Sequence, residues 1–236
     1  MPSDPAVFER PKNQRPGGTR RWWKWVLLIV GGGGLALVIA YGFYIVSLSK
    51  TILPIGNSVR NLDPLLMATP DDPSFGNPEA RVVIVEFSDF ECPFCSQAHP
   101  VVNELRRRYS DKVYFIYRDF PLTQIHPQAL LAAMAGQCAH EQGKFWGMHD
   151  KLFINQDRLA LENIKKYAVE IGLNSLQFNG CLDTGKYLSE IEQDISDGLS
   201  VGIEATPTFI VNGVKLPGVI PLATFEKIIT AEYGAQ

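Results

Sequence analysis

The chain has 236 residues, with 22 basic and 25 acidic side chains and a formal net charge of −3 at pH 7. This length allows one sizeable hydrophobic core, with an added tail or elaboration. Because the chain is slightly acidic and has no strong basic excess, we expect no nucleic-acid partner. The composition is that of a globular protein, but its apolar residues are unevenly distributed.

The first distinctive segment is an uncharged apolar run over residues 26–48. As a helix of about 35 Å it would be long enough to cross the hydrocarbon core of a bilayer. Trp22, Trp23 and Trp25 precede it, as aromatic side chains do at membrane interfaces. A cleaved signal peptide is the alternative, but its apolar core is normally about 7–15 residues long and is followed by small residues. We therefore predict an uncleaved transmembrane helix over residues 26–48, in contact with the lipid bilayer.

The flanks of this run predict its orientation. Six basic residues precede it, and Lys50 alone follows closely. Positive charge stays cytoplasmic, so residues 1–25 would form a basic cytoplasmic tail and the rest would lie on the periplasmic side of the cell (inner) membrane. Residues 49–79 are rich in proline and show little periodicity, which predicts an extracytoplasmic tether. The folded domain would then occupy residues 80–236.

From residue 81 onward the chain alternates between strand and helix patterns. The β-branched and aromatic run at 81–90 predicts a buried strand, and apolar spacing after it predicts a helix to about residue 109. A second buried strand is expected at 112–120. Strand, helix and strand at this spacing predict a right-handed βαβ unit.

A long helical region follows the βαβ unit. Apolar residues recur at three-to-four spacing over about residues 122–203. Strand patterns return at 206–216, with Asn212-Gly213 as a hairpin turn, and an amphipathic helix at 222–233 follows. The fold class is therefore an α/β sandwich that is interrupted by an inserted helical subdomain.

Cys92 and Cys95 stand at the junction between the first strand and its helix. Zinc would require further ligands at close spacing, which the remaining cysteines and histidines do not supply. A structural disulfide would close a very short loop and stabilise little, whereas copper(I) stays open because thiolates suit it. Redox exchange fits the position best, since a helix N-terminus favours the Cys92 thiolate. Cys95, one turn later, is placed as the more buried resolving partner.

Three stretches, "EFSDFECPFC", "QGKFWGMHDKLF" and "ATPTFIVNG", resemble the DsbA-like family of thioredoxin-fold thiol–disulfide oxidoreductases. The resemblance covers about residues 72–233 and implies a thioredoxin fold with a helical insertion. It implies that Cys92 is the attacking thiol and Cys95 the resolving one. It also implies that Pro207, which follows Thr206, is the cis-proline beside the active site. No cofactor or metal is expected, because the cysteine pair carries the electrons.

The same resemblance implies a role for Glu86, the position of the family's buried acid beneath the active site. A carboxyl group buried in an apolar strand has a raised pKa and can exchange a proton with Cys95. The alternation of residues leaves open that Glu86 points to solvent, because apolar residues lie on both faces of this strand.

Cys138 and Cys181 lie in separate helices of the predicted insertion. Several members of the resembled family have an additional bridge in this region, which implies a disulfide between these two residues. In an exported chain such a bridge would pin the helical subdomain. Two buried free thiols are the alternative.

The expected function is that of a membrane-anchored, extracytoplasmic oxidoreductase that forms disulfides in exported proteins through a mixed disulfide at Cys92. A membrane or soluble redox partner would reset the cysteine pair. Between the cysteines, Pro93-Phe94 lacks the histidine that strongly oxidising family members have at the second position. A disulfide reductase or isomerase of the same fold therefore stays open, as does a copper(I)-binding thiol module.

Overall fold

A computed structural model describes residues 41, 68, 69 and 71–234 of the chain. The described fold lies within the compact unit Asn57–Gln236. The basic tail and, apart from Tyr41, the predicted transmembrane helix at 26–48 fall outside the described residues. Within the described ranges, no helix combines the length and the apolar character needed to cross a membrane.

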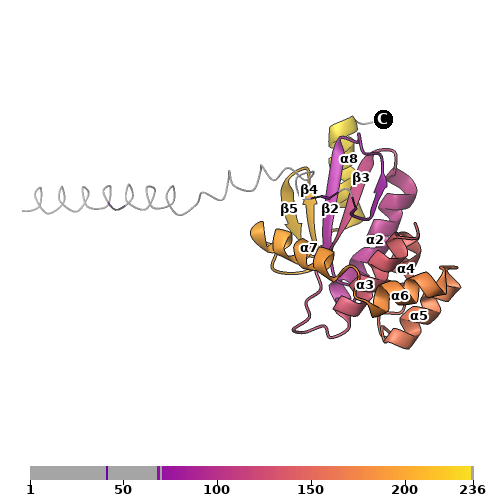
Figure 1. Cartoon of the computed structure of the whole chain (residues 1–236). Coiled ribbons are helices and arrows are strands. Elements are labelled where there is room, and N and C mark those ends of the chain that lie inside the picture. Colours follow the sequence, from indigo (N-terminus) through magenta and orange to yellow (C-terminus); the bar gives the residue numbers. More distant parts are fainter. Residues whose placement is uncertain (1–40, 42–67, 70, 235–236) are drawn as a thin grey trace, which may run out of the picture. The chain divides into compact units, whose positions relative to one another are not determined.

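A five-stranded sheet in the order β1-β3-β2-β4-β5 forms the centre of the fold (Figure 1). Its strands are β1 (Ser74–Gly76), β2 (Val82–Ser88), β3 (Val113–Asp119), β4 (Thr208–Val211) and β5 (Val214–Pro217). β2 and β3 are parallel and are joined by helix α2 (Pro93–Tyr109), whereas the other strand pairs are antiparallel. The predicted βαβ unit is therefore confirmed.

The predicted hairpin between β4 and β5 is also confirmed. Asn212 and Gly213 form its turn with φ values of 46° and 82°. Both residues tolerate positive φ, as a two-residue hairpin turn requires at these positions. The Asn212 side chain also joins the hairpin to β2, because its Oδ1 accepts a hydrogen bond of 2.8 Å from the backbone N–H of Val83.

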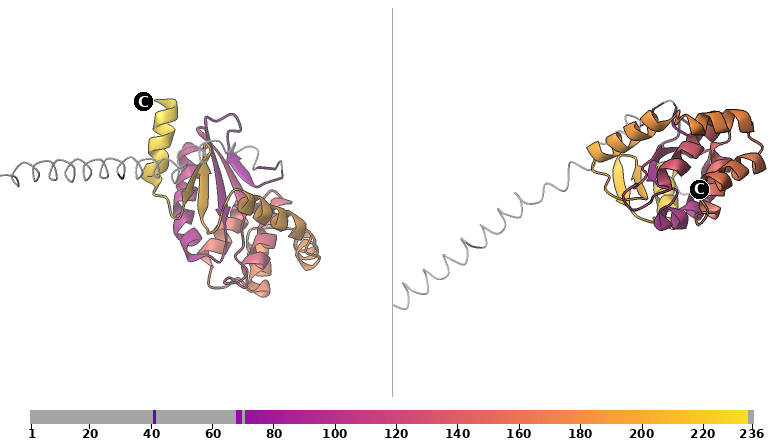
Figure 2. Two further views of the ribbon diagram at one scale, coloured as in Figure 1. Left: turned by 90° about the vertical axis from the view of Figure 1, so that its left-hand side faces the viewer. Right: turned by 60° about the horizontal axis from the view of Figure 1, so that its bottom comes forward.

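Side-chain alternation directs the two faces of the sheet to different helices. Val82 and Ile84 of β2 pack with α2 and with α8 (Leu222–Tyr233). Val85 and Phe87 face the opposite way, toward α7 (Leu188–Ser200). The views in Figures 1 and 2 show the resulting sandwich, with the sheet between these two helical layers. Glu86 and Ser88 share the face of Val82 and Ile84, so they point toward α2.

Four helices gather at one end of the sheet (Figures 1 and 2). They are α3 (Ala129–His140), α4 (Phe145–Ile154), α5 (Leu161–Glu170) and α6 (Ser175–Asp183). A disulfide between Cys138 and Cys181, with a Cα–Cα distance of 5.9 Å, joins α3 to α6. These helices share one hydrophobic cluster with Cys92 and Cys95, so the insertion is continuous with the cysteine site. Helix α7, which the prediction had included in the insertion, instead covers the sheet.

The folded region begins before residue 80, where the sequence had placed the end of the tether. β1 pairs with β3, and Phe75 stacks on Phe115 with ring centroids 4.8 Å apart. Asp72 is also buried. Three residues of strand are too few to show a periodic pattern, and prolines on both sides of β1 favoured the interpretation as a tether.

Candidate active site

Cys92 is the N-cap residue of α2, and Pro93 occupies the first turn of that helix. Its Sγ lies 3.3 Å from the carbonyl oxygen of Thr206. The antiparallel pairing of β2 with β4 brings these distant residues together, since Thr206 lies two residues before the start of β4. The Thr206–Pro207 peptide bond is cis. The structure thus places Cys92, Thr206 and Pro207 side by side, as the resemblance implied.

The environment of Cys92 favours its thiolate. Hydrogen bonding from the Cys95 thiol is the largest cause that lowers the pKa of Cys92, which falls from 9.0 to about 5. The side chain of Thr206 and the backbone N–H groups of Phe94 and Cys95 lower the pKa further, while burial opposes the change. These N–H groups belong to the first turn of α2, where no helical partner is available. At neutral pH the Cys92 thiol is therefore ionised and nucleophilic.

Cys95 has the opposite character. It is fully buried, and its Sγ accepts a hydrogen bond of 3.4 Å from the backbone N–H of Asp89. Burial raises the pKa of Cys95 well above the ordinary thiol value, and the hydrogen bond with Cys92 and the charge of the Cys92 thiolate add to this effect. The pair is therefore asymmetric: one ionised thiol at the helix terminus contacts one protonated thiol in the core.

Glu86 lies beneath the cysteines on the α2 face of β2. Its side chain is buried, so the solvent-facing alternative left open by the alternation of residues is wrong. Burial raises the pKa of Glu86 from 4.5 to about 8, which keeps the carboxyl group protonated at neutral pH. A protonated acid at this place can supply a proton to Cys95.

The loop that carries Cys92 is held by hydrogen bonds to residues of the insertion. Gln156, just after α4, donates hydrogen bonds from Nε2 to the carbonyl oxygens of Phe90 (2.9 Å) and Cys92 (2.8 Å). Glu91 accepts a hydrogen bond of 2.6 Å from the backbone N–H of Gln128. Sequence reasoning missed Gln156, because its partners lie 64 and 66 positions away and are backbone atoms.

Asp89 is a second anchor of the same loop. Its Oδ1 accepts a hydrogen bond of 2.7 Å from the N–H of Glu91. Its Oδ2 is bound by the N–H of Leu122 at 2.8 Å and by Nδ1 of His126 at 2.7 Å. The sequence shows an aspartate directly after the predicted strand, so this residue could have been identified as a candidate for the site. Asp89 fixes the segment after β3 against the cysteine loop.

Three phenylalanines, Phe90, Phe94 and Phe120, stand near the cysteines, where they could form an apolar surface for a peptide or ordinary core. Phe90 and Phe120 belong to the core, whereas Phe94 has an exposed fraction of 57%. Ile125, on the segment that Asp89 and His126 hold, is also exposed. Of these three phenylalanines, only Phe94 is therefore available to a partner beside Cys92.

One group of possible metal ligands occurs among the described residues. His99, His149 and Asp150 bring their ligand atoms within 4.8 Å of one another. Asp150 Oδ1 is hydrogen-bonded to His99 Nε2 at 2.9 Å and to His149 Nδ1 at 3.2 Å. The Arg106 guanidinium lies 2.7 Å from the other carboxylate oxygen. A cation already paired with the carboxylate disfavours a metal ion there, and the network joins α2 to α4 as a polar structural contact.

The fold and the paired cysteines define a thioredoxin-type α/β domain, with a helical insertion, whose site supports disulfide exchange. The sequence profile described as Thioredoxin matches residues 68–231, and the chain belongs to that family.

Solved structures with the same fold include DsbA-like oxidoreductases. A thioredoxin-like oxidoreductase from Silicibacter pomeroyi has a TM-score of 0.65 and 27% identity, and the match covers 75% of this chain and 99% of that one. Wolbachia pipientis alpha-DsbA1 has a TM-score of 0.64 and 28% identity, with 73% and 96% covered. BdbD from Bacillus subtilis, at 23% identity, has a TM-score of 0.61, covers 70% and 94%, and supports the fold alone.

The curated relatives are named as Na(+)/H(+) antiporters, not as oxidoreductases. A Na(+)/H(+) antiporter NhaA 1 from Mycolicibacterium vanbaalenii is 39% identical over 145 residues, which are 61% of this chain and 24% of the antiporter. An NhaA 3 from Salinispora tropica is 40% identical over 165 residues, 70% of this chain and 25% of that protein. The chain thus spans about a quarter of the length of these relatives, so antiport is not transferred to it.

Proposed function

We propose that this protein is an extracytoplasmic thiol–disulfide oxidase, which forms disulfides in exported proteins through Cys92 and Cys95. The observation that carries the proposal is the asymmetry of the pair. Cys92 is an N-cap residue with a pKa lowered to about 5, and Cys95 is buried with its pKa raised. A stabilised thiolate is a good leaving group, which makes the Cys92–Cys95 disulfide a better oxidant.

The reaction runs in two exchanges. A substrate thiolate attacks Cys92 Sγ of the Cys92–Cys95 disulfide, and Cys95 leaves with the electron pair of the broken bond and takes up a proton. A second substrate thiolate then attacks the substrate sulfur of the mixed disulfide, and Cys92 leaves as a thiolate. The substrate has lost two electrons and the cysteine pair has gained them. A membrane or soluble redox partner then reoxidises the pair.

The proposed location is the outer side of the cell membrane, with residues 26–48 as a single-pass anchor in the lipid bilayer and residues 1–25 in the cytoplasm. The Cys138–Cys181 disulfide supports an oxidising compartment, because such bridges are rare in the cytosol. The basic residues before the apolar run support the orientation.

Mixed-disulfide trapping tests the chemistry. The Cys95→Ser variant, with Cys92 first converted to a mixed disulfide with glutathione, is expected to form a covalent complex with a reduced substrate protein as glutathione leaves, while Cys92→Ser forms none. The oxidised wild-type domain is expected to form disulfides in the same substrate. A reduction potential of the Cys92–Cys95 pair near that of cytosolic thioredoxin, about −270 mV, would indicate a reductase instead. Stoichiometric copper(I) binding without thiol exchange would replace the proposal with a metal-binding function.

Protease treatment of spheroplasts tests the location. Added protease is expected to release the domain from membranes while the basic tail stays protected. A freely soluble protein that begins near residue 50 would show that the apolar segment is a cleaved signal.

A further inference from the structure

Asp89 contacts both cysteines of the site through its backbone. Its N–H donates a hydrogen bond of 3.4 Å to Cys95 Sγ, and its carbonyl oxygen accepts one of 3.1 Å from the N–H of Cys92. In the proposed exchange, Cys95 Sγ is the atom that receives the electron pair of the broken disulfide. The conformation of Asp89 therefore decides how well a hydrogen-bond donor is aimed at this sulfur.

The side chain of Asp89 fixes that conformation. It is 0% exposed, and its two oxygens accept three hydrogen bonds, from the N–H groups of Glu91 and Leu122 and from Nδ1 of His126. A carboxylate oxygen only accepts, so the imidazole carries a hydrogen on Nδ1. Two of these donors are backbone groups, which most residue types would supply. The third belongs to a side chain that is specific to this sequence.

The backbone around His126 aims its ring at Asp89. The His126 N–H donates a hydrogen bond of 2.9 Å to the carbonyl oxygen of Leu122. This turn brings the Leu122 N–H and the imidazole to the same oxygen of Asp89, Oδ2, at 2.8 and 2.7 Å. The two donors therefore act on the carboxylate together.

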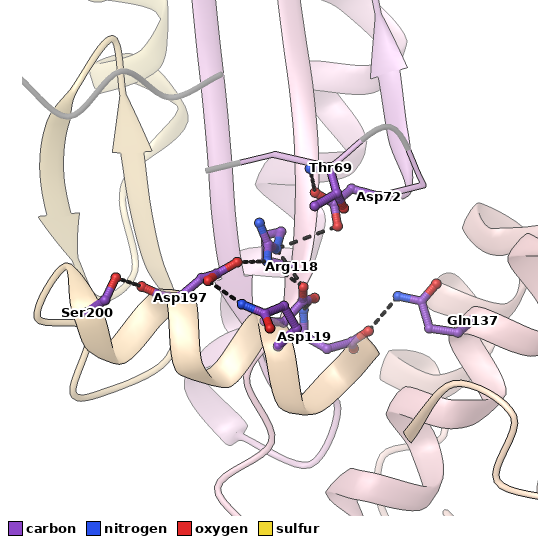
Figure 3. Close-up of polar contacts among 9 residues, drawn as sticks. Thr69, Asp72, Arg118, Asp119, Gln137, Asp197 and Ser200 are labelled. Carbon is purple, nitrogen blue, oxygen red and sulfur yellow. Dashed lines mark hydrogen bonds and ion pairs between the residues drawn. The ribbon is translucent and has the colours of Figure 1, made fainter. Parts of the chain in front are cut away.

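The segment between β3 and α3, which carries His126, is also tied down at both ends. At its start, the Phe120 N–H donates a hydrogen bond of 2.8 Å to the carbonyl oxygen of Ser88. Beyond its end, Gln137 of α3 donates from Nε2 to Asp119 Oδ2 at 2.7 Å (Figure 3). The imidazole is thus held in place by the fold before any substrate arrives.

The hydrogen bond from Asp89 to Cys95 matters most while the disulfide opens or closes. Cys95 Sγ is neutral in the disulfide and in the thiol, but it carries negative charge as the S–S bond breaks. A fixed donor aimed at an atom where charge develops stabilises the transition state more than the neutral states on either side. The bond also strengthens when its acceptor is charged. The Asp89 N–H is such a donor.

We propose that His126 is a positioning residue of the disulfide exchange, which holds Asp89 so that its N–H stabilises the charge on Cys95 Sγ. The inference rests on the proposed function. A thiolate attacks Cys92 Sγ, the bond to Cys95 breaks, and Cys95 Sγ takes the electron pair while it accepts the hydrogen bond. This thiolate then takes up a proton from the medium. In the reverse direction Cys95 loses the proton, attacks Cys92 Sγ of a mixed disulfide and displaces the thiolate bound there.

The first test varies the donor at position 126. His126→Ala removes the hydrogen bond from Nδ1, whereas His126→Asn can place an amide N–H close to the position of Nδ1. His140→Ala is the control, because this histidine belongs to the same insertion but its ring contacts that of Phe145. The full-length variants are oxidised and mixed with a small dithiol, and the loss of the disulfide is followed by acid quenching and thiol alkylation.

His126→Ala is expected to react about tenfold more slowly than the wild type. This loss is below the roughly hundredfold effect of removing a whole donor, because the Asp89 N–H is misplaced and not removed. His126→Asn should keep most of the wild-type rate, and His140→Ala should match the wild type. A wild-type rate in His126→Ala would overturn the inference.

A second measurement separates an effect on Cys95 from a general loss of structure. In a Cys95→Ser background, Cys92 is first converted to a mixed disulfide with glutathione, and a small dithiol then releases Cys92 while no charge develops at position 95. This rate should be equal with and without His126→Ala. Slowing of both reactions by the same factor would show that His126 gives structural support only, and would also overturn the inference.

Asp89 supplies an independent check of the route. Asp89→Asn keeps an acceptor for the Glu91 N–H but replaces Oδ2 by an amide nitrogen, so it should slow the first reaction as well. Adding His126→Ala to Asp89→Asn should slow it no further, because both act on the same contact; additive effects would contradict the inference. His126→Gln replaces His126→Ala in each comparison should the alanine variant not fold. A wild-type protein without any exchange at Cys92 would instead refute the proposed function.

Discussion

The ionised state of Cys92 makes the redox potential depend on pH in a defined way. The pKa of Cys92 is lowered from 9.0 to about 5 in the reduced protein, and that of Cys95 is raised. A lowered pKa stabilises the reduced form by an amount that is complete above pH 9 and is lost as the pH falls through about 5. Lowering the pH from 7 to 4 is therefore the perturbation that tests the assignment.

The magnitude follows from the same two pKa values. At pH 7 a thiol with the ordinary pKa of 9.0 is protonated, whereas Cys92, with a pKa of about 5, is ionised. The reduced protein is therefore stabilised by the equivalent of two pH units, the interval between a pKa of about 5 and pH 7. At 1.36 kcal/mol per unit this is about 3 kcal/mol, which for a two-electron couple makes the disulfide about 60 mV more oxidising. Between pH 5 and 7, reduction takes up one proton, and the potential should change by about 30 mV per pH unit. Below pH 5 two protons are taken up, and the slope should double.

The assay is equilibration with glutathione buffers from pH 4 to pH 7, followed by acid quenching and alkylation. A break in slope near pH 5 is the expected result. A constant slope of about 60 mV per pH unit over the whole range would show that Cys92 is protonated at neutral pH. That outcome would refute the argument from the helix N-terminus and from the Cys95 hydrogen bond.

Three further predictions concern stability and positioning. Glu86→Gln should raise the free energy of unfolding by about 3 kcal/mol at pH 7. The pKa of Glu86 is about 8 in the folded protein against the ordinary value of 4.5, so this carboxyl group destabilises the fold above pH 4.5. An equal gain at pH 4, measured by urea unfolding, would contradict the prediction. Gln156→Ala removes two hydrogen bonds to carbonyl oxygens of the loop that carries Cys92, which should lower the free energy of unfolding by about 2 kcal/mol and slow disulfide exchange. Unchanged exchange kinetics would show that this loop keeps its conformation without Gln156. Replacing both Cys138 and Cys181 by Ala opens a loop of 43 residues and should lower the free energy of unfolding by about 4 kcal/mol, as measured by thermal or denaturant unfolding. Equal stability of the variant and the wild type would contradict this prediction.

The sequence predicted those parts of the fold that have a strong local pattern. The β-branched runs at β2 and β3 and the Asn212-Gly213 turn are patterns within a few residues, and the structure contains each of them. β1 escaped notice because its pairing with β3 and its contacts with Trp146 involve residues far along the chain. The position of α7 over the sheet was missed for the same reason: a helical pattern does not say which layer the helix joins.

The candidate site divides in the same way. Cys92 and Cys95 were found from spacing and from their place at a strand–helix junction. The burial of Glu86 stayed undecided, because both faces of a central strand are covered and alternation alone cannot select one. The contact between Cys92 and Thr206 depends on the pairing of β2 with β4, which local sequence does not encode.

The Cys138–Cys181 disulfide between α3 and α6 makes the maturation of each new chain depend on disulfide formation, the chemistry proposed for the protein itself. A newly made chain has four thiols, which allow three fully paired connectivities, and the fold needs Cys138 joined to Cys181 while the other two stay free to cycle. A chain in this condition is itself a reduced polypeptide awaiting a disulfide. Under the proposed oxidase function, mature copies with an oxidised Cys92–Cys95 pair would form this disulfide in nascent ones, so maturation would be autocatalytic. In a reducing environment the helical insertion would go unpinned, and supply of the working protein would follow the oxidant supply of its compartment.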